Sequence, residues 1–141
     1  MNKDKSPKTI EIQVVSQFIK DMSFENFRSN QTNFSSDDIN YELNITVQIE
    51  KEENPRSQVI LKLLCESRDK KGTIYILEIE YGGNFEIGSA EKGEKRKILL
   101  VECPKLLFPF LRRLAYDITK EGGFFPLNIK PLDFSSAQDA S

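Results

Sequence analysis

The sequence contains no histidine and no tryptophan, and only two cysteines among its 141 residues. Histidine is the usual proton-transfer group of enzymes near neutral pH and a frequent zinc ligand, so a serine triad of the ordinary kind and most zinc sites are excluded. Cys65 and Cys103 are too far apart for a redox pair and too few for a structural zinc site. One disulfide between them stays open, but two buried thiols of a cytosolic protein fit better. We expect a protein that is not an enzyme and has no cofactor and no metal.

A strong excess of charge of one sign is also missing. The formal net charge is -2 and the isoelectric point about 5.3, which gives no basic surface for nucleic acid. No apolar run approaches the ~20 residues of a membrane span, and the polar start MNKDKSPKTIEIQ does not resemble a signal peptide. We therefore expect a cytoplasmic protein with no nucleic-acid partner and no membrane insertion.

What is present is a series of alternating apolar and polar residues, which is typical of half-buried strands. The run from Tyr41 to Glu50 is the clearest, and Asp69-Lys70-Lys71-Gly72 predicts a tight hairpin turn. A change of phase near Val15 predicts a bulge in the first strand, and Gly82-Gly83 predicts a break or bulge in the last. The predicted strands cover residues 9–22, 41–50, 58–66 and 73–81, the last resuming after the glycines to Ile87.

After a charged loop over 89–97, apolar residues recur at helical spacing from Ile98 to Lys120. Pro104 and Pro109 predict two segments or a kink, and Gly122-Gly123 ends the helix. The fold class is α+β, a four-stranded antiparallel sheet followed by a long, proline-interrupted helix packed on it. We expect a disordered tail over 1–9, one domain over 10–134 with an extended, aromatic-rich end over 124–134, and a short disordered tail over 135–141.

One helix covers only one face of a sheet, and the other face of the last strand begins with the apolar residues Ile74 and Ile76. This predicts that a second chain covers that face, and hence an oligomer. The carboxylate pairs Asp37-Asp38 and Glu52-Glu53 lie in hydrophilic turns, so we interpret them as solvated residues and not as catalytic pairs. The ten phenylalanines suggest a groove for extended apolar peptide, although most such side chains are core.

Three blocks of the sequence resemble the SecB protein-export chaperone family. They are IKDMSFEN at 19–26, LEIEYGGNFEI at 77–87 and LLVECPKLLFPFLRRLAYDITKEGGFFPLNIKPLDF at 99–134, and they follow the family's order and spacing. The resemblance implies a SecB-like fold assembled as a homotetramer, a dimer of dimers. It also implies an ATP-independent chaperone that binds unfolded secretory precursor proteins and delivers them to SecA, the motor of the translocase.

The resemblance also implies three sets of site residues. An acidic patch on the sheet would bind SecA through Asp21, Glu25, Ile76 and Glu78. A client-binding groove between sheet and helix would be lined by Ile12, Tyr75, Leu106, Phe108 and Phe110. The opposite face of the last strand, with Leu77, Ile79 and Tyr81, would be oligomer interface or core.

The sequence departs from the family pattern after Phe134. Family members usually continue into a second helix and an acidic tail that touches SecA, whereas only SSAQDAS follows here. Either the chain is truncated, or this member relies on the patch on the sheet. The alternative function is a SecB-like chaperone of a toxin–antitoxin system, against which the acidic patch counts. A small lipid- or ligand-binding enzyme domain is a third hypothesis, and the lack of histidine counts against it.

Overall fold

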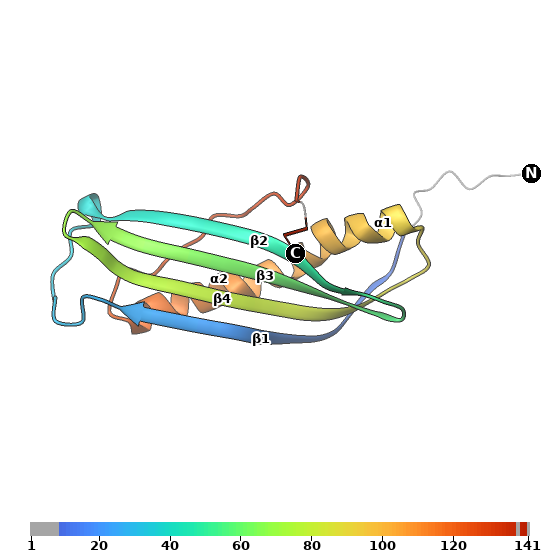
Figure 1. Cartoon of the computed structure of the whole chain (residues 1–141), viewed down its shortest axis with the longest axis horizontal. Helices are drawn as coiled ribbons and strands as arrows, with labels where there is room; N and C mark the ends of the chain where they lie inside the picture. Colours follow the sequence, from blue (N-terminus) through green and yellow to red (C-terminus); the bar gives the residue numbers. More distant parts are fainter. Residues whose placement is uncertain (1–8, 138, 141) are drawn as a thin grey trace, which may run out of the picture.

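A long antiparallel sheet, crossed on one face by a helix, makes up the computed structural model, which describes residues 9–137, 139 and 140 (Figure 1). The strand order is β1-β4-β3-β2, so β1 and β2 are the two edges. The helix lies behind the sheet and runs diagonally from the β2 side to the β1 side (Figure 1). The elements are β1 Ile12–Asn26, a short 3₁₀-helix Ser36–Asp38, β2 Asn40–Glu52, β3 Arg56–Asp69, β4 Gly72–Ile87, α1 Lys92–Lys97, a π-helical segment Ile98–Glu102 and α2 Cys103–Glu121.

The predicted α+β fold with four strands and a C-terminal helix is confirmed. The bulge near Val15 is also confirmed: β1 carries one extra residue between Val14 and Ser16, and a second between Ile19 and Asp21. The hairpin after Asp69 turns at Gly72, whose φ of 122° is accessible to glycine at little cost. The strands β2 and β3 extend beyond both predicted ends, because polar residues that continue a ladder leave no apolar signal. The strand β1 begins later and ends later than predicted, and β4 begins one residue earlier and ends at Ile87 as predicted.

The glycine pair 82–83 does not break or bulge β4, which runs through it without a change of its own register. The two glycines allow close approach on opposite faces of the strand. A Cβ atom at Gly82 would collide with Ile60 and lie 2.8 Å from Phe18, and one at Gly83 would lie 2.9 Å from Leu107 of α2. The absence of a side chain at Gly83 therefore lets the helix pack closely on the sheet, and its absence at Gly82 leaves room for Ile60 and Phe18 on the other face.

The segment 89–97 was predicted as a loop, but its second half is α1. None of the α1 residues is buried, so the segment has no apolar periodicity for a sequence reading to detect. Polar contacts hold it to the β2–β3 turn instead. Arg96 pairs with Glu52 at 3.0 Å, and the Lys95 ammonium donates to the carbonyl oxygen of Glu53 at 3.2 Å.

The prolines do not divide the helix into two separate segments, and α2 continues through Pro109. The helix instead has π-helical geometry over Ile98–Glu102, shortly before Pro104. Proline has no N–H and its ring clashes with the carbonyl four residues earlier. A local i→i+5 turn moves that carbonyl away, so the irregularity appears just before the proline.

The core lies between the helix and the alternate residues of β3 and β4 that face it. Leu61, Leu77, Leu107 and Leu111 are completely buried there, and so is Thr119 near the end of α2. Truncating a buried leucine to alanine costs about 2–5 kcal/mol, so this layer dominates the stability of the fold.

The segment 124–134 is extended and packed down by apolar side chains as expected, with Leu127, Ile129 and Phe134 buried. The following residues do not simply trail into solvent. The backbone N–H of Ala140 donates to the carbonyl oxygen of Val47 on β2 at 2.9 Å, so the described part of 135–141 returns to the sheet. Of the predicted N-terminal tail, residues 1–8 lie outside the described residues.

Candidate functional site

The sheet face away from the helix carries a group of carboxylates, which we call the acidic face: Asp21, Glu25, Glu42 and Glu78. The strand register brings them together. In the β1–β4 ladder Glu25 lies opposite Ile76, Ser23 opposite Glu78, and Asp21 opposite Glu80. The Ser23 hydroxyl donates to the Glu78 carboxylate at 3.4 Å. The predicted SecA-binding residues therefore share one face and adjacent positions, although this placement does not test their role.

Cations neutralise the surrounding carboxylates but not these four. Lys62 pairs with Glu80 at 3.2 Å, Lys20 with Glu50 at 3.1 Å, and Arg68 with Glu66 at 2.9 Å. Within residues 9–137, 139 and 140, no ion pair forms at any member of the acidic face. The acidic face thus keeps an excess of negative charge, with Arg68 interacting electrostatically with Glu42 and no cation in an ion pair with the four, and this excess attracts a cationic partner.

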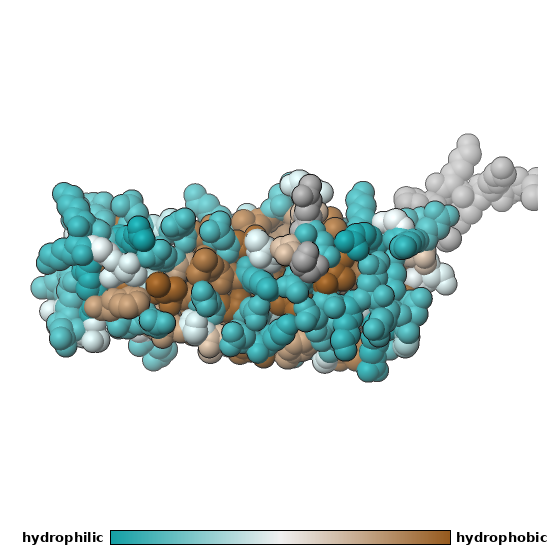
Figure 2. Space-filling view, viewed as in Figure 1, coloured by the Kyte–Doolittle hydropathy of each residue, from teal (hydrophilic) through white to brown (hydrophobic). Residues whose placement is uncertain are grey.

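Apolar side chains lie between these carboxylates. Leu64 on β3 is exposed and Ile76 on β4 is half-buried, and both line a shallow hollow together with Glu42, Glu66 and Glu78. Figure 2, which views the molecule from this side, shows apolar side chains between hydrophilic ones on the sheet. A partner with cationic and apolar side chains on one surface would complement this arrangement.

The other face has an exposed apolar strip beside β1, which we call the apolar rim: Ile19, Met22, Leu106 and Phe110. Ile19 and Met22 lie opposite Tyr81 and Ile79 in the ladder, so they point to the helix side. The Phe110 ring stacks on Tyr81 with centroids 6.1 Å apart and planes 11° apart. Every member of the rim is exposed, and Phe110 retains 47% of its surface.

The five residues predicted for the client groove do not converge on one groove. Phe108 packs on Phe134 at 6.0 Å, whereas Phe110 packs on Tyr81, because two helical positions differ by about 200° in direction. Tyr75 is only 1% exposed. Ile12 pairs with Ile87, at the opposite end of β4 from Tyr75. Only Leu106 and Phe110 share an open surface, at i and i+4 of α2.

The oligomer-interface prediction needs a similar correction. Leu77 and Ile79 are completely buried under the helix of the same chain, and Tyr81 is covered by Phe110. These residues belong to the core, which was the alternative to an oligomer interface for this face of β4. The apolar side chains that do face outward, Ile19 and Met22, belong to the neighbouring strand β1.

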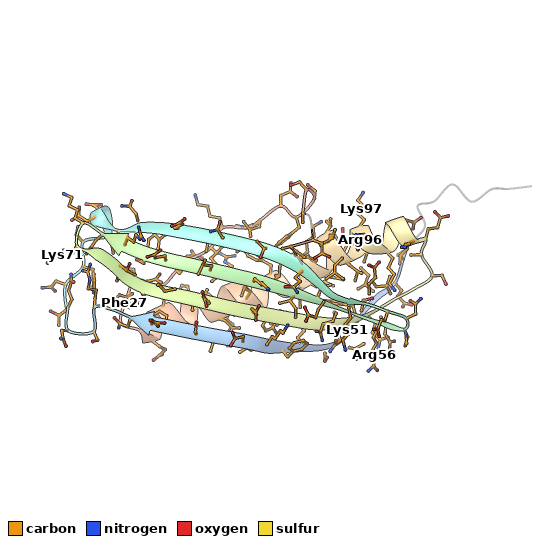
Figure 3. The ribbon with its side chains drawn as sticks, in the orientation of Figure 1. Phe27, Lys51, Arg56, Lys71, Arg96 and Lys97 are labelled. Carbon is orange, nitrogen blue, oxygen red and sulfur yellow. The ribbon has the colours of Figure 1, made fainter. Side chains whose placement is uncertain are left out.

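Tyr75 belongs to a cluster of four aromatic rings at the end of the sheet where β1 finishes. Its ring centroid lies 5.0 Å from Phe124 and 5.4 Å from Phe24, and Phe34 adds an edge contact to Phe124 at 5.3 Å. Phe27 and Lys71 lie at this end of the molecule, and Lys51 and Arg56 at the other (Figure 3). The cluster joins β1, β4 and the segment after α2.

No activated nucleophile is found among the buried thiols and phenols. Burial raises the pKa of the Cys65 thiol to about 11 and that of Cys103 to about 12, so both are protonated at neutral pH. Burial likewise raises the pKa of the Tyr75 phenol. No three potential metal-ligating side chains come together in the part of the chain that the structure describes.

Sequence reasoning missed Glu42 and Leu64 on the sheet and Ile19 and Met22 on the rim. Glu42 lies on the polar side of the run 41–50, and its position was visible there. Its neighbours in space were not, because β2 reaches β4 only through β3 in the strand order. Ile19 and Met22 were within the expected strand, but the second bulge of β1 decides which face each one takes.

Comparison of the sequence with known proteins identifies the family. The sequence model described as "Preprotein translocase subunit SecB" matches residues 4–139. The chain belongs to the SecB family. The Protein-export protein SecB of Cereibacter sphaeroides is 37% identical over 131 residues, covering 89% of this chain and 78% of its own length. SecB of a Ruegeria strain is 38% identical over 130 residues with the same coverage.

Among solved structures, the chain resembles the SecB-like chaperone Rv1957 of Mycobacterium tuberculosis, determined in complex with a ChAD peptide from the Rv1956 HigA1 antitoxin. The TM-score is 0.70 at 14% identity, over 86% of this chain and 91% of that one. This likeness supports the SecB-like fold and nothing further. Within the described residues, no helix is both long and apolar enough to span a membrane.

Proposed function

We propose that this protein is an ATP-independent chaperone that binds unfolded precursor proteins in the cytoplasm and delivers them to SecA. The observation that carries the proposal is membership of the SecB family over nearly the whole chain, at 37% identity to proteins named for protein export. The surface supports binding over catalysis. It offers exposed apolar side chains on both faces, whereas the two thiols are buried and protonated.

The apolar rim is the proposed client contact on the helix side. Leu106 and Phe110 are exposed without any change of the fold, and an unfolded chain presents apolar side chains that need cover. Burial is worth about 25 cal/mol per Å², so a few hundred Å² gives several kcal/mol before ordering costs are subtracted. Several such sites acting on one client chain give useful retention without nucleotide.

The acidic face is the proposed SecA-docking surface, with Glu42 and Leu64 added to the four residues predicted from the sequence. Its support is the group of four carboxylates beside Leu64 and Ile76, none of which forms an ion pair among the described residues. Contacts between exposed charges weaken with salt, since the Debye length falls from ~10 Å at 0.1 M to ~3 Å at 1 M.

The test combines client holding with motor binding. The chain should suppress aggregation of an unfolding precursor without nucleotide, and it should bind purified SecA at low salt. Glu78→Gln combined with Asp21→Asn should weaken SecA binding by about tenfold, the size expected for ~1.4 kcal/mol, with client holding unchanged. Glu94→Gln and Asp117→Asn, on the helix, are the matched control. Equal SecA affinity in the parent and the acidic-face variant would refute the docking assignment.

Control of a toxin–antitoxin pair remains the second candidate, because the solved Mycobacterium tuberculosis chaperone carries an antitoxin peptide. Export is favoured because the relatives named for export are far closer in sequence, at 37% against 14% identity. The two functions separate in one binding experiment. An export chaperone holds many unrelated unfolded precursors and binds SecA, whereas a dedicated one prefers an antitoxin segment and does not need SecA.

We also propose a homotetramer of two dimers. The apolar rim continues along the open edge of β1, so a second chain meeting this edge would cover Ile19 and Met22. Two structurally different surfaces then remain, one for each partner class: the acidic face for SecA and the remaining helix-side apolar surface for clients.

A further inference from the structure

The two edges of the sheet are treated differently by the chain itself. At the β2 edge the C-terminal residues Asp139 and Ala140, which we call the strap, lie beside Val47 in a parallel bridge. Ala140 donates its N–H to the carbonyl oxygen of Val47 at 2.9 Å, and the N–H of Ile49 donates to Asp139 Oδ1 at 3.1 Å. The strap thus satisfies outward-facing backbone groups of β2 as a short added strand does.

A cation from the helix holds the strap in place. Arg96 of α1 lies 3.3 Å from Asp139 Oδ2, while its other nitrogen pairs with Glu52 at 3.0 Å (Figure 3 labels Arg96). The side chain of Asp139 is only 15% exposed. One carboxylate therefore links the C-terminal segment to both β2 and the first helix.

The rest of this edge is open. In an antiparallel ladder alternate residues direct both backbone groups away from the partner strand, and Val47 and Ile49 show that these are the odd-numbered residues of β2. The outward backbone groups of Tyr41, Leu43 and Ile45 have no hydrogen-bond partner among the described residues. A strand edge of this kind accepts an extended chain.

The side chains along the open stretch are suited to the same occupant. Tyr41 and Leu43 are exposed on the helix side of β2, because the helix crosses to the β1 side before it reaches this end of the sheet (Figure 1). An occupant here gains backbone hydrogen bonds from the edge and apolar contact from these side chains. That combination recognises extended polypeptide with little dependence on its sequence.

We propose that the β2 edge from Tyr41 to Ile49 binds an extended segment of an unfolded client as an added strand, and that the strap is a built-in competitor for its distal part. This proposal rests on the proposed chaperone function. It specifies how the chaperone binds the backbone of a client in addition to its side chains. The strap lowers the apparent affinity of the edge by the fraction of time it is bound. A client long enough to cover the edge displaces Asp139 and frees Arg96.

The first experiment needs no client. The whole chain carrying Asp139→Ala, which loosens its own strap, is titrated with the synthetic peptide SSAQDAS, which is residues 135–141, and backbone amide signals are followed by NMR. We expect shifts at Val47 and Ile49 that are absent when Asp139 of the peptide is replaced by alanine. Shifts confined to the acidic face or the apolar rim, or no shift at millimolar peptide, overturn the proposal.

The second experiment uses the full-length chain and a reduced, alkylated protein that stays unfolded. Asp139→Ala should raise client affinity by up to about tenfold. This is the gain expected when a competitor that occupies the β2 edge most of the time is removed. Asp133→Ala is the matched control, because Asp133 accepts a hydrogen bond from the N–H of Ser135 and is not part of the bridge to β2. Leu43→Pro removes an outward N–H but no ladder bond, so it should weaken binding with the fold retained.

The outcomes separate the two proposals. Client binding that leaves the β2 amides unchanged, and that Asp139→Ala does not strengthen, overturns the edge but leaves the chaperone function standing. No client binding by any variant overturns the chaperone function, and with it the use of the edge by clients. If Asp139→Ala instead makes two chains associate through β2, which light scattering would show, the edge is a contact between copies and the proposal fails.

Discussion

At the scale of single residues, one ion pair joins the loop after β1 to the β3–β4 hairpin. The Arg28 guanidinium donates two hydrogen bonds to Asp69, at 2.6 and 3.0 Å, and a third to the carbonyl oxygen of Gly72 at 3.2 Å. Both charged side chains are only 13% exposed. Two parallel bonds between planar groups fix geometry as well as charge, so the loop is held at one angle to the sheet.

The pair predicts a particular dependence of stability on pH. The hydrogen bond from Arg28 lowers the pKa of Asp69, so the pair stabilises the fold above the unfolded-state pKa of roughly 3.9, and this contribution is lost as pH falls through the folded-state pKa. Asp69→Asn should therefore melt below the parent at pH 7, and the difference should shrink below about pH 4. Thermal denaturation across this range tests it, and Arg28→Lys, which keeps charge but loses the paired geometry, should lie between the two.

At the scale of elements, the sequence predicted the strands and the helix whose apolar residues recur with a regular period. It missed the element that has no such pattern. The run from Tyr41 to Ile49 puts all its apolar residues on the helix side of the sheet, where Val47 and Ile49 are buried, and β2 was predicted from this alternation. The helix α1 was missed because it buries nothing. Gly82 and Gly83 are predicted as a break because glycine is common where strands end. Their role is to make room for Phe18, Ile60 and Leu107, which come from other elements and leave no local pattern around the glycines.

The same limit applies to the candidate site. The resemblance assigned Asp21, Glu25 and Glu78 to one patch, and alternation along β4 independently put Ile76 and Glu78 on one face. Phe108 and Phe110 are two positions apart in α2 and so point in different directions, but which of them meets Phe134 and which meets Tyr81 depends on how the whole helix is rotated on the sheet. Burial of Tyr75 depends on Phe24 and Phe124, which come from distant parts of the chain.

The helix α2 and the extended segment after it are joined by one buried hydroxyl. Thr119 Oγ1 accepts from the N–H of Leu127 at 2.8 Å and donates to the carbonyl oxygen of Ala115 at 2.8 Å. Thr119→Val keeps the shape but leaves the buried N–H of Leu127 without a partner, which costs about 1–3 kcal/mol. We expect a lower melting temperature and faster hydrogen exchange at Leu127. Thr119→Ser should restore most of both, and unchanged exchange in the valine variant would contradict this role.

At the scale of the whole molecule, the fold has three differently equipped surfaces. The acidic face presents charge, the β1 side presents the apolar rim beside an open edge, and the β2 edge is partly closed by the strap. The helix side of the sheet is covered by the diagonal helix and by the segment after α2, which runs behind the sheet from the β1 side to the β2 side (Figure 1). The contacts proposed for the motor, for a client and for other copies therefore fall on different residues of one short chain.

The homotetramer is the prediction that belongs to this scale. A stable interface buries about 800 Å² on each partner, with a few apolar residues contributing most of the affinity. A charge within the rim would reduce the free energy of association by about 2 kcal/mol or more, so Ile19→Glu should raise the dissociation constant by about thirtyfold or more.

Light scattering of the parent at micromolar concentration should give four times the mass of the chain, and Ile19→Glu should give a smaller species. Tyr41→Glu is the matched control, since Tyr41 is equally exposed but lies on the β2 edge. A parent that is monomeric, or a Tyr41 variant that dissociates while the Ile19 variant does not, would show that copies do not meet at the β1 side.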